Sequence, residues 1–350
     1  MRRFLSRVLP LLLSFGLIFS CTGCSTVLVL AGKARENSEA SSSVISESSA
    51  SSGVISTPVP TEDGDLRAFY TDVANAESVT VMVYMIGSDL ESEDGSATDD
   101  LLEMADAALS ENVHLVLQTG GTETWWNDVC TDDESERFVI ENGDMTLLQS
   151  LGSMNMTDAD TLSDFIRFSA ESYPADRYEL ILWDHGGGTM TGFGYDELYE
   201  DTSLTLSSLS TALYNGGVQF DFIGFDACLM ATAEVAYALD PYADYLIASE
   251  ESEPGEGWAY KNWLTMLAED PAVPTAELGK KLADDFLEAY IFADMPTLSV
   301  LDLRYVPELY AALESYWGSA YTALQNGSYG AFSQVRNNCL LYTSPSPRDG

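Results

Sequence analysis

Six short runs of apolar, often β-branched residues lie between positions 79 and 303 of the chain. They occupy residues 79–86 (VTVMVYMI), 113–119 (VHLVLQT), 178–183, 220–225, 245–249 and 298–303. Runs of this length and composition are typical of buried β-strands. The intervening segments place apolar residues at helical spacing, most clearly at 98–109, 161–172 and 204–214. The pattern therefore predicts strands that alternate with helices.

Near-continuous apolar strands separated by helices are typical of a mostly parallel sheet that is covered on both faces. We therefore expect an α/β fold, a three-layer α/β/α sandwich around a roughly six-stranded sheet. Residues 125–148 interrupt the alternation and are expected to form a hairpin excursion. With 350 residues, of which 46% are hydrophobic, the chain is long enough to bury a full core.

The N-terminal region has the pattern of an export segment. Arg2, Arg3 and Arg7 precede a stretch without charges from Val8 to Gly32. The small residues before Cys24 resemble a bacterial lipobox, which makes Cys24 the candidate lipidation site and the cell membrane the expected location. A single transmembrane anchor is the alternative, because the uncharged stretch is similar in length to the ~20 residues that cross a bilayer. Both interpretations place the rest of the chain outside the cytoplasm.

Composition divides the chain into four expected parts. Residues 1–24 form the signal, and residues 25–65 form a Ser-rich tether that buries too little apolar surface to fold. Residues 66–338 form the folded domain, whose natural C-terminus is expected to be missing. Residues 339–350 are expected to be a non-native tail, because the last eleven read LLYTSPSPRDG, like a translated sequencing adaptor.

The charge balance narrows the class of partner. There are 56 acidic residues against 15 basic ones, which gives a formal net charge of −41. Phosphate contacts need clustered Lys and Arg, so nucleic acid is excluded as an expected partner. Such acidity fits an exported, soluble surface or a preference for cationic substrates. Only Cys130 and Cys228 lie within the expected folded domain, so no disulfide framework is predicted.

Two predicted strands end in residues that carry chemistry. The run 178–183 is followed by Asp-His-Gly-Gly-Gly, with the histidine at 185, and the run 220–225 by Asp-Ala-Cys, with the cysteine at 228. Loops at the carboxyl ends of neighbouring parallel strands meet at one edge of a sheet. A nucleophilic cysteine needs a nearby base or cation and backbone N–H groups for an oxyanion. The N–H groups of Gly186 and Cys228 could serve, and a helix beginning near Leu229 would favour the thiolate. A structural histidine and an ordinary buried cysteine are the alternative.

The segments LILWDHGGG and FIGFDACLM resemble the paired signature of the clostripain-like cysteine peptidases. This family belongs with the caspases, legumains and gingipains. Residues 84–92 (YMIGSDLES) and 248–258 (ASEESEPGEGW) are also similar to it. The resemblance implies a caspase-like fold, Cys228 as nucleophile and His185 as the general acid that protonates the leaving amine. It further implies an oxyanion hole from the amides of Gly186 and Cys228.

The resemblance also implies substrates with Arg or Lys before the scissile bond. A carboxylate must then lie at the base of the S1 pocket. Asp226 matches the family's acid two residues before the nucleophile, and a second acid is expected from Glu250, Glu251, Glu253 or Glu256, among which the sequence does not choose. Solvated surface acids are the alternative for all of them. The expected partners are therefore proteins or peptides that carry basic residues.

The chemistry implied by the resemblance requires no cofactor, but several family members depend on calcium. Residues 89–100 (DLESEDGSATDD) offer the oxygen ligands that calcium prefers. They do not match the EF-hand pattern, because Gly95 falls at the seventh place, and a solvated acidic loop is the alternative. Residues 186–227 contain no Lys or Arg, so self-cleavage there at a basic residue is not expected.

Two other classes of protein remain as alternatives. A catalytically inactive surface lipoprotein could use the same fold for binding, since a fold does not determine a function. A zinc hydrolase is disfavoured, because the chain has only two histidines and His114 lies in a predicted strand without a second ligand at helical spacing.

Overall fold

The computed structural model describes residues 68–199, 202–290 and 296–335. The export segment, the candidate lipidation site Cys24, the Ser-rich tether and the C-terminal tail lie outside the described residues. No helix in the described part of the chain is both long and apolar enough to cross a bilayer.

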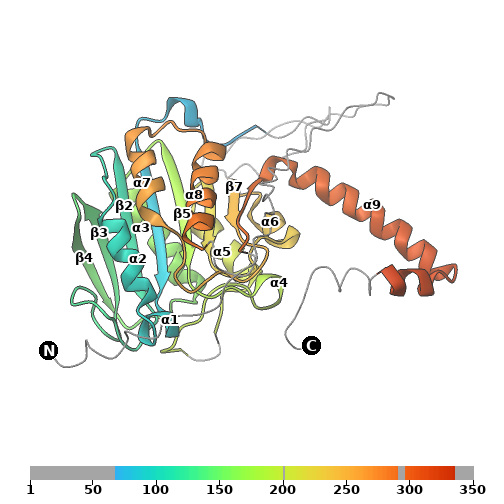
Figure 1. The fold of residues 1–350 in the computed structure, drawn as a ribbon, viewed down its shortest axis with the longest axis horizontal. Helices are drawn as coiled ribbons and strands as arrows, with labels where there is room; N and C mark the ends of the chain where they lie inside the picture. The colour runs from blue at the N-terminus through green and yellow to red at the C-terminus, as the bar shows by residue number, and fades with distance from the viewer. Residues whose placement is uncertain (1–67, 200–201, 291–295, 336–350) are drawn as a thin grey trace, which may run out of the picture. The chain divides into compact units, whose positions relative to one another are not determined.

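A single eight-stranded sheet, in the order β4-β3-β2-β1-β5-β6-β7-β8, organises the fold (Figure 1). The five central strands, β2, β1, β5, β6 and β7, are parallel to one another. The strands are β1 (Val79–Ile86), β2 (Val113–Gly120), β3 (Ser135–Glu141), β4 (Asp144–Gly152), β5 (Arg177–Trp183), β6 (Phe220–Asp226), β7 (Ala243–Ala248) and β8 (Ser299–Asp302). The mostly parallel α/β architecture predicted from the sequence is confirmed.

The sheet has eight strands, two more than the roughly six predicted from the apolar runs. The hairpin expected at residues 125–148 is formed by β3 and β4, which pair antiparallel and extend the sheet beyond β2. Side chains on β4 are partly or fully exposed, so this edge strand lacks the continuous apolar run that predicted six of the other strands. The short β8 closes the other edge, antiparallel to β7.

Helices cover both faces of the sheet and create two apolar cores. Alternate residues of β1 point to opposite sides: Val81 and Val83 to one core, Met82 and Tyr84 to the other. The first core is covered by α2 (Ser96–Ala105), α7 (Tyr260–Glu269) and α8 (Thr275–Ala289). The second is covered by α3 (Ala159–Ser172), α5 (Leu206–Gly216) and α6 (Ala233–Leu239). This arrangement is the three-layer sandwich.

The remaining elements are short, except for the last helix. They are η1 (Val73–Asn75), α1 (Ser88–Ser92), α4 (Gly188–Thr191), η2 (Leu303–Tyr305) and α9 (Val306–Gln325). The α9 helix contacts α6, where Tyr310 stacks on Tyr237 with ring centroids 4.9 Å apart. In Figure 1, α1 and α4 follow β1 and β5 at the lower edge of the sheet, where the parallel strands end.

Candidate active site

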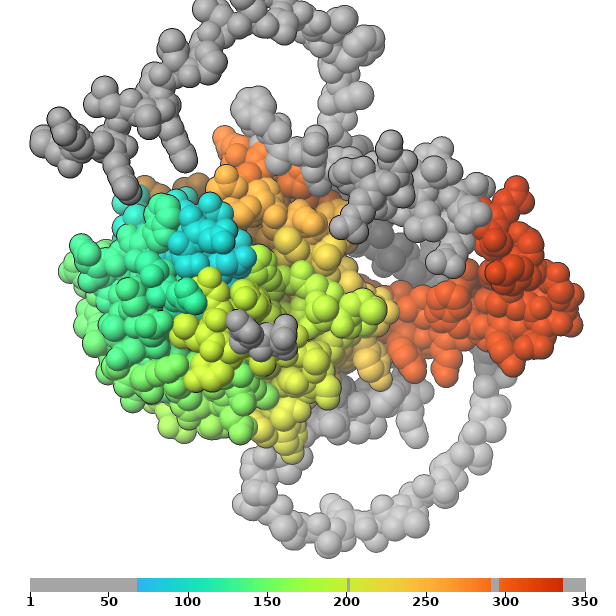
Figure 2. Space-filling view, turned by 90° about the horizontal axis from the view of Figure 1, so that it is seen from below, coloured from blue at the N-terminus to red at the C-terminus, as the bar shows by residue number. Residues whose placement is uncertain are grey.

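His185 and Cys228 lie level with each other at the carboxyl edge of the sheet. Strands β5 and β6 are parallel neighbours, and their register pairs Trp183 with Asp226. His185 and Cys228 each lie two residues after the last residue of their strand. Figure 2 shows this edge from below, where the cyan segment after β1 lies beside the yellow-green segment after β5.

The loops after β5 and β6 touch through their backbones. A Cβ atom at Gly186 would lie 2.0 Å from the carbonyl oxygen of Cys228, and one at Gly188 would lie 2.9 Å from that of Leu229. Real Cβ atoms do not approach other atoms to 2.0 Å, so only glycine allows this approach at position 186. The glycines after His185 thus bring its loop against the cysteine.

The helix expected near Leu229 does not begin there, so that prediction is wrong. The α6 helix begins at Ala233, and its N-cap Thr232 accepts a hydrogen bond from the N–H of Val235. Leu229 instead has a φ of 66°, and its N–H donates to the carbonyl of Glu251. The chain after Cys228 pairs with the loop after β7 rather than coiling, so no helix dipole acts directly on the sulfur.

A backbone group from the loop after β7 reaches the Cys228 sulfur. The N–H of Glu253 donates to Sγ over 3.2 Å, and the Glu253 carbonyl lies 3.8 Å from the same atom. Cys228 is a free, partly exposed thiol, whereas Cys130 is buried. Burial raises the pKa of the Cys130 thiol to about 12, which makes it a poor nucleophile near neutral pH.

Asp89 forms an ion pair with His185 that the sequence analysis did not anticipate. The His185 Nε2 and Asp89 Oδ1 atoms are 2.7 Å apart, and both side chains are a little under half exposed. Asp89 comes from α1, directly after β1, and was considered only as part of the acidic stretch 89–100. Its position in the segment YMIGSDLES was the available signal, because β1 is the parallel neighbour of β5.

Asp184 anchors the start of the histidine loop. Its buried carboxylate accepts hydrogen bonds from the Ser88 hydroxyl, at 2.7 Å, and from the Tyr195 N–H. Burial raises the pKa of Asp184 to about 7, while the electrostatic interaction with His185 and the hydrogen bonds oppose that rise. Asp184 therefore ties the loop to α1 on one side and to Tyr195 on the other.

Asp226, the predicted S1 acid, is buried at the end of β6. Its Oδ2 atom accepts hydrogen bonds from the Trp258 N–H at 3.0 Å and the Tyr260 hydroxyl at 2.8 Å. Burial raises the pKa of Asp226 to about 6, although these hydrogen bonds favour the ionised form. The carboxyl of Glu253 lies beside it and interacts with it electrostatically.

The structure separates the four candidates for the second acid. Glu253 approaches both Asp226 and Cys228. Glu250 is exposed and accepts a hydrogen bond from Ser299 on β8, and Glu251 and Glu256 are exposed. Sequence reasoning missed Asp100 on α2, whose buried carboxylate accepts from the Trp183 indole and whose pKa is raised by burial and then by Asp226.

The acidic stretch 89–100 is mostly helical rather than the solvated loop that was the alternative to a calcium site. Most of it folds into α1 and the first turn of α2, and Asp89 and Asp100 are engaged by His185 and Trp183. Within the described ranges, no three His, Cys, Asp or Glu side chains are placed to hold a metal ion together. His114 lies on β2, where its ring is 5.3 Å from that of Tyr173.

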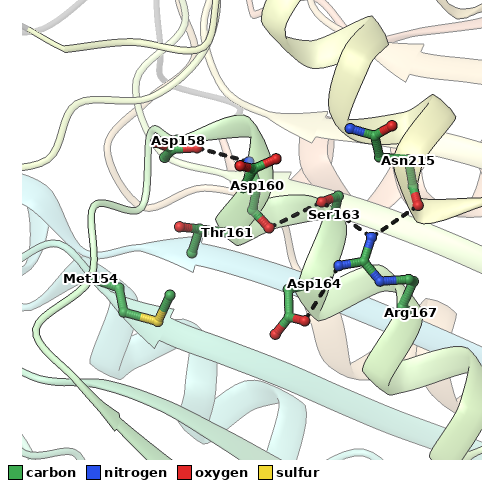
Figure 3. A pocket seen from close by; sticks show the side chains of 8 residues that line it. All are labelled: Met154, Asp158, Asp160, Thr161, Ser163, Asp164, Arg167 and Asn215. Carbon is green, nitrogen blue, oxygen red and sulfur yellow. Dashed lines mark hydrogen bonds and ion pairs between the residues drawn. The ribbon is translucent and has the colours of Figure 1, made fainter.

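A shallow cavity of about 610 Å³ lies beside α3 and α5, and neither His185 nor Cys228 lines it (Figure 3). Its cation, Arg167, is engaged by Asp164 and by the backbone carbonyl of Asn215. The residues around it are Met154, Asp158, Asp160, Thr161, Ser163, Asp164, Arg167 and Asn215. They include neither a cysteine nor a histidine, so the strand ends remain the candidate site.

Comparisons with known proteins find a similar sequence and similar folds. The chain is 35% identical over 123 residues to clostripain of Hathewaya histolytica, a match that covers 30% of this chain and 23% of that protein. Its fold is similar to a secreted C11 cysteine protease from Bacteroides thetaiotaomicron in complex with an irreversible peptide inhibitor. That match has a TM-score of 0.56 at 23% identity and covers 67% of this chain and 68% of that one.

A second solved structure is an inactive zymogen C11 protease from Parabacteroides distasonis, with a TM-score of 0.53 and 27% identity over 68% of this chain and 65% of that one. The model of the clostripain family, Peptidase_C11, matches residues 83–338, which is well over half of the chain and includes both strand ends described above. The chain therefore belongs to the clostripain family of cysteine peptidases.

Proposed function

We propose that this chain is an extracytoplasmic cysteine endopeptidase that cleaves after Arg or Lys, with Cys228 as nucleophile and His185 as general acid. The observation that carries the proposal is the close approach of Gly186 to the Cys228 carbonyl. This contact holds the histidine loop against the cysteine loop at the edge where parallel sheets place their active sites. Family membership supplies the reaction class.

Each step of peptide hydrolysis has a candidate group. The Cys228 sulfur attacks the scissile carbonyl, and the Glu253 N–H that reaches Sγ stabilises negative charge there before attack. The N–H groups of Gly186 and Cys228 donate to no other described residue, which leaves them for the oxyanion. His185 then protonates the leaving amine, and water hydrolyses the thioester to release the acid product and the free thiol.

The basic preference rests on buried carboxyl groups next to the nucleophile. Asp226 and Glu253 lie beside each other at the end of β6, close to Cys228. A guanidinium or ammonium group bound between them would gain charge-assisted hydrogen bonds in a site of low dielectric constant. A neutral P1 side chain would leave these carboxyls uncompensated, which favours Arg and Lys over Ala.

We further propose that residues 66–338 form the peptidase domain and that lipid on Cys24, or a single anchor, retains it at the cell membrane. The sequence pattern of residues 1–24 supports this location. The similar protein from Bacteroides thetaiotaomicron is described as secreted. Calcium dependence stays a prediction based on the resemblance alone.

Covalent labelling tests the activity directly. A peptidyl acyloxymethyl ketone with Arg at P1 should modify the wild-type chain on Cys228, and Cys228→Ala should remain unmodified, as read by intact-mass spectrometry. The same probe with Ala at P1 should react at least about tenfold more slowly, because it lacks a partner for the buried acids. Parallel reactions with calcium and with a chelator test the calcium prediction. A folded wild-type chain that no Arg or Lys probe labels in either condition would exclude the peptidase function.

A further inference from the structure

Two carboxyl groups meet beside the candidate nucleophile, and among the described residues no Lys or Arg forms an ion pair with either of them. Asp226 is 5% exposed, and both of its hydrogen bonds from Trp258 and Tyr260 end on Oδ2. The two carboxyl oxygens of Glu253 are buried, and the polar side-chain groups within hydrogen-bonding reach of them are the Asp226 carboxyl and the Trp258 indole. The Glu253 N–H on the Cys228 sulfur holds this residue in place, so its carboxyl is directed at Asp226 rather than at solvent.

A third carboxyl group lies on the far side of Asp226. Asp100 and Asp226 both approach Gly257: a Cβ atom there would lie 2.8 Å from Asp100 Oδ2 and 3.0 Å from Asp226 Oδ2. Asp100 has the Trp183 indole as a donor, at 2.6 Å. The Asp226–Glu253 pair therefore faces a further buried acid instead of a compensating base.

The strongest electrostatic influences on this pair all come from acidic groups and a thiol. The groups that face the three carboxyls are Asp99 and Glu103 from α2, Cys228 after β6, Tyr260 from α7 and Tyr290 directly after α8. No Lys, Arg or His is among the described groups with the strongest electrostatic effect on the pKa values of these three carboxyls. Lys261, the next residue after Tyr260, pairs with Asp106 instead.

Two adjacent carboxylates that are buried without a cation repel each other and lose their hydration. Retaining a proton is the less costly state, as in other carboxyl pairs that share one site. The pKa of Glu253 is accordingly raised well above its usual range, first by burial and then by Asp226. An entering cation changes the balance, because it pairs with both carboxylates and removes the reason to keep the proton.

We propose that the Asp226–Glu253 pair holds one proton in the free protein and releases it to solvent when a guanidinium or ammonium side chain binds. Glu253 is then the second acid of the basic pocket, and cation binding is coupled to proton release. The inference rests on the proposed specificity for Arg and Lys. The charge of the pair changes from −1 to −2 as one positive charge enters, so the occupied pair carries the same net charge as the empty one.

Calorimetry on the full chain carrying Cys228→Ser tests this coupling, since the variant contributes no thiol proton and its hydroxyl keeps an acceptor for the Glu253 N–H. The probe is acetyl-arginine amide, with acetyl-citrulline amide as its neutral isostere. Titration at pH 6 in two buffers of different ionisation enthalpy measures the protons released. We expect roughly half to one proton per bound arginine, and weak binding without release for citrulline.

Substitutions then identify the carboxyl group that holds the proton. Glu253→Gln in the same background should bind the arginine probe at least about tenfold more weakly and release fewer than about 0.2 protons. Glu256→Gln alters an exposed acid of the same loop and should leave the proton release unchanged. Glu269→Gln at the end of α7 controls for the loss of one surface charge. Thermal melts establish that each variant is folded.

Each other outcome overturns the inference. Arginine binding without proton release, release that persists in Glu253→Gln, or release that disappears in Glu256→Gln would show that this pair does not hold the proton. Failure of the arginine probe to bind would show that the pair takes no cation. The proposed function is judged separately, because labelling of wild-type Cys228 by the arginine ketone does not depend on where the proton resides.

Discussion

The environment of His185 is set by two aspartates, its chain neighbour Asp184 and the distant Asp89 from α1. Asp184 is buried and ties the backbone to Ser88 and Tyr195, whereas Asp89 meets the imidazole directly at 2.7 Å. An Nε2–H that donates to Asp89 leaves the other ring nitrogen for the reaction. Asp89 is therefore expected to be a positioning residue that acts through His185.

Replacement of Asp89 tests this role. Asp89→Asn should lower kcat about fivefold with KM little changed, because a half-exposed ion pair contributes no more than about 1 kcal/mol. Steady-state kinetics on an arginine amide substrate provide the measurement. Asp94→Asn, an exposed neighbour, is the matched control and should retain the wild-type rate. An unchanged kcat in folded Asp89→Asn protein would mean that the ion pair does not orient the histidine.

At the scale of elements, the site depends on how closely two strand–loop junctions pack. The register of β5 and β6 brings His185 and Cys228 level, but the backbone contact at Gly186 sets the separation of the loops. The loop after β7 then adds the Glu253 N–H on the sulfur and hydrogen bonds to the backbone beyond Cys228. Three consecutive parallel strands, β5, β6 and β7, thus contribute to one site.

A single methyl group should disrupt this packing. Gly186→Ala places a Cβ atom against the Cys228 carbonyl, so one loop must move by an ångström or more. Misplacement of that size costs on the order of a hundredfold in rate, which kcat/KM for an arginine substrate would report. Gly318→Ala on α9, where a Cβ meets nothing within 4 Å, should leave activity unchanged and the fold at least as stable. Wild-type activity in Gly186→Ala would contradict the proposed contact.

At the scale of the whole molecule, the opposite end of the sheet carries a second buried charge cluster. Arg177 at the start of β5 lies 3.1 Å from Glu179 and 2.6 Å from Asp221, and all three side chains are buried. One guanidinium thus serves two carboxylates. Burial raises the pKa of Glu179 to about 8, with Arg177 opposing the rise and Asp221 adding to it.

This cluster predicts how stability depends on pH. The folded chain binds the Glu179 proton more tightly than the unfolded chain, whose ordinary pKa is 4.5. The free energy of unfolding should therefore fall as pH rises from about 4.5 to about 8. Glu179→Gln, which cannot ionise, should gain about 1–2 kcal/mol over wild type at pH 9, but much less at pH 5. Urea unfolding at the two pH values measures the difference, and an equal effect at both would refute it.

The sequence by itself determined the fold class, the two loops that carry the candidate chemistry and the resemblance to the family. These features are local: apolar runs of strand length, glycines after a histidine, and an Asp-Ala-Cys segment at a strand end. The parallel order of the central strands follows from the alternation of strands and helices, because a crossover helix returns the chain in the same direction. The pair His185 and Cys228 could thus be placed at one edge before the structure was known.

Only the tertiary structure decided which side chains accompany that pair. Asp89, Asp100 and Glu253 reach the site from three different elements, and local sequence does not distinguish each of them from the neighbouring acids of its own segment. The helix predicted to begin near Leu229 is also decided by contacts between distant residues. The backbone there forms hydrogen bonds to Ser249 and Glu251 on a neighbouring loop, and these override the local helical pattern. Contacts between residues far apart in the chain depend on burial and register, which short sequence patterns do not encode.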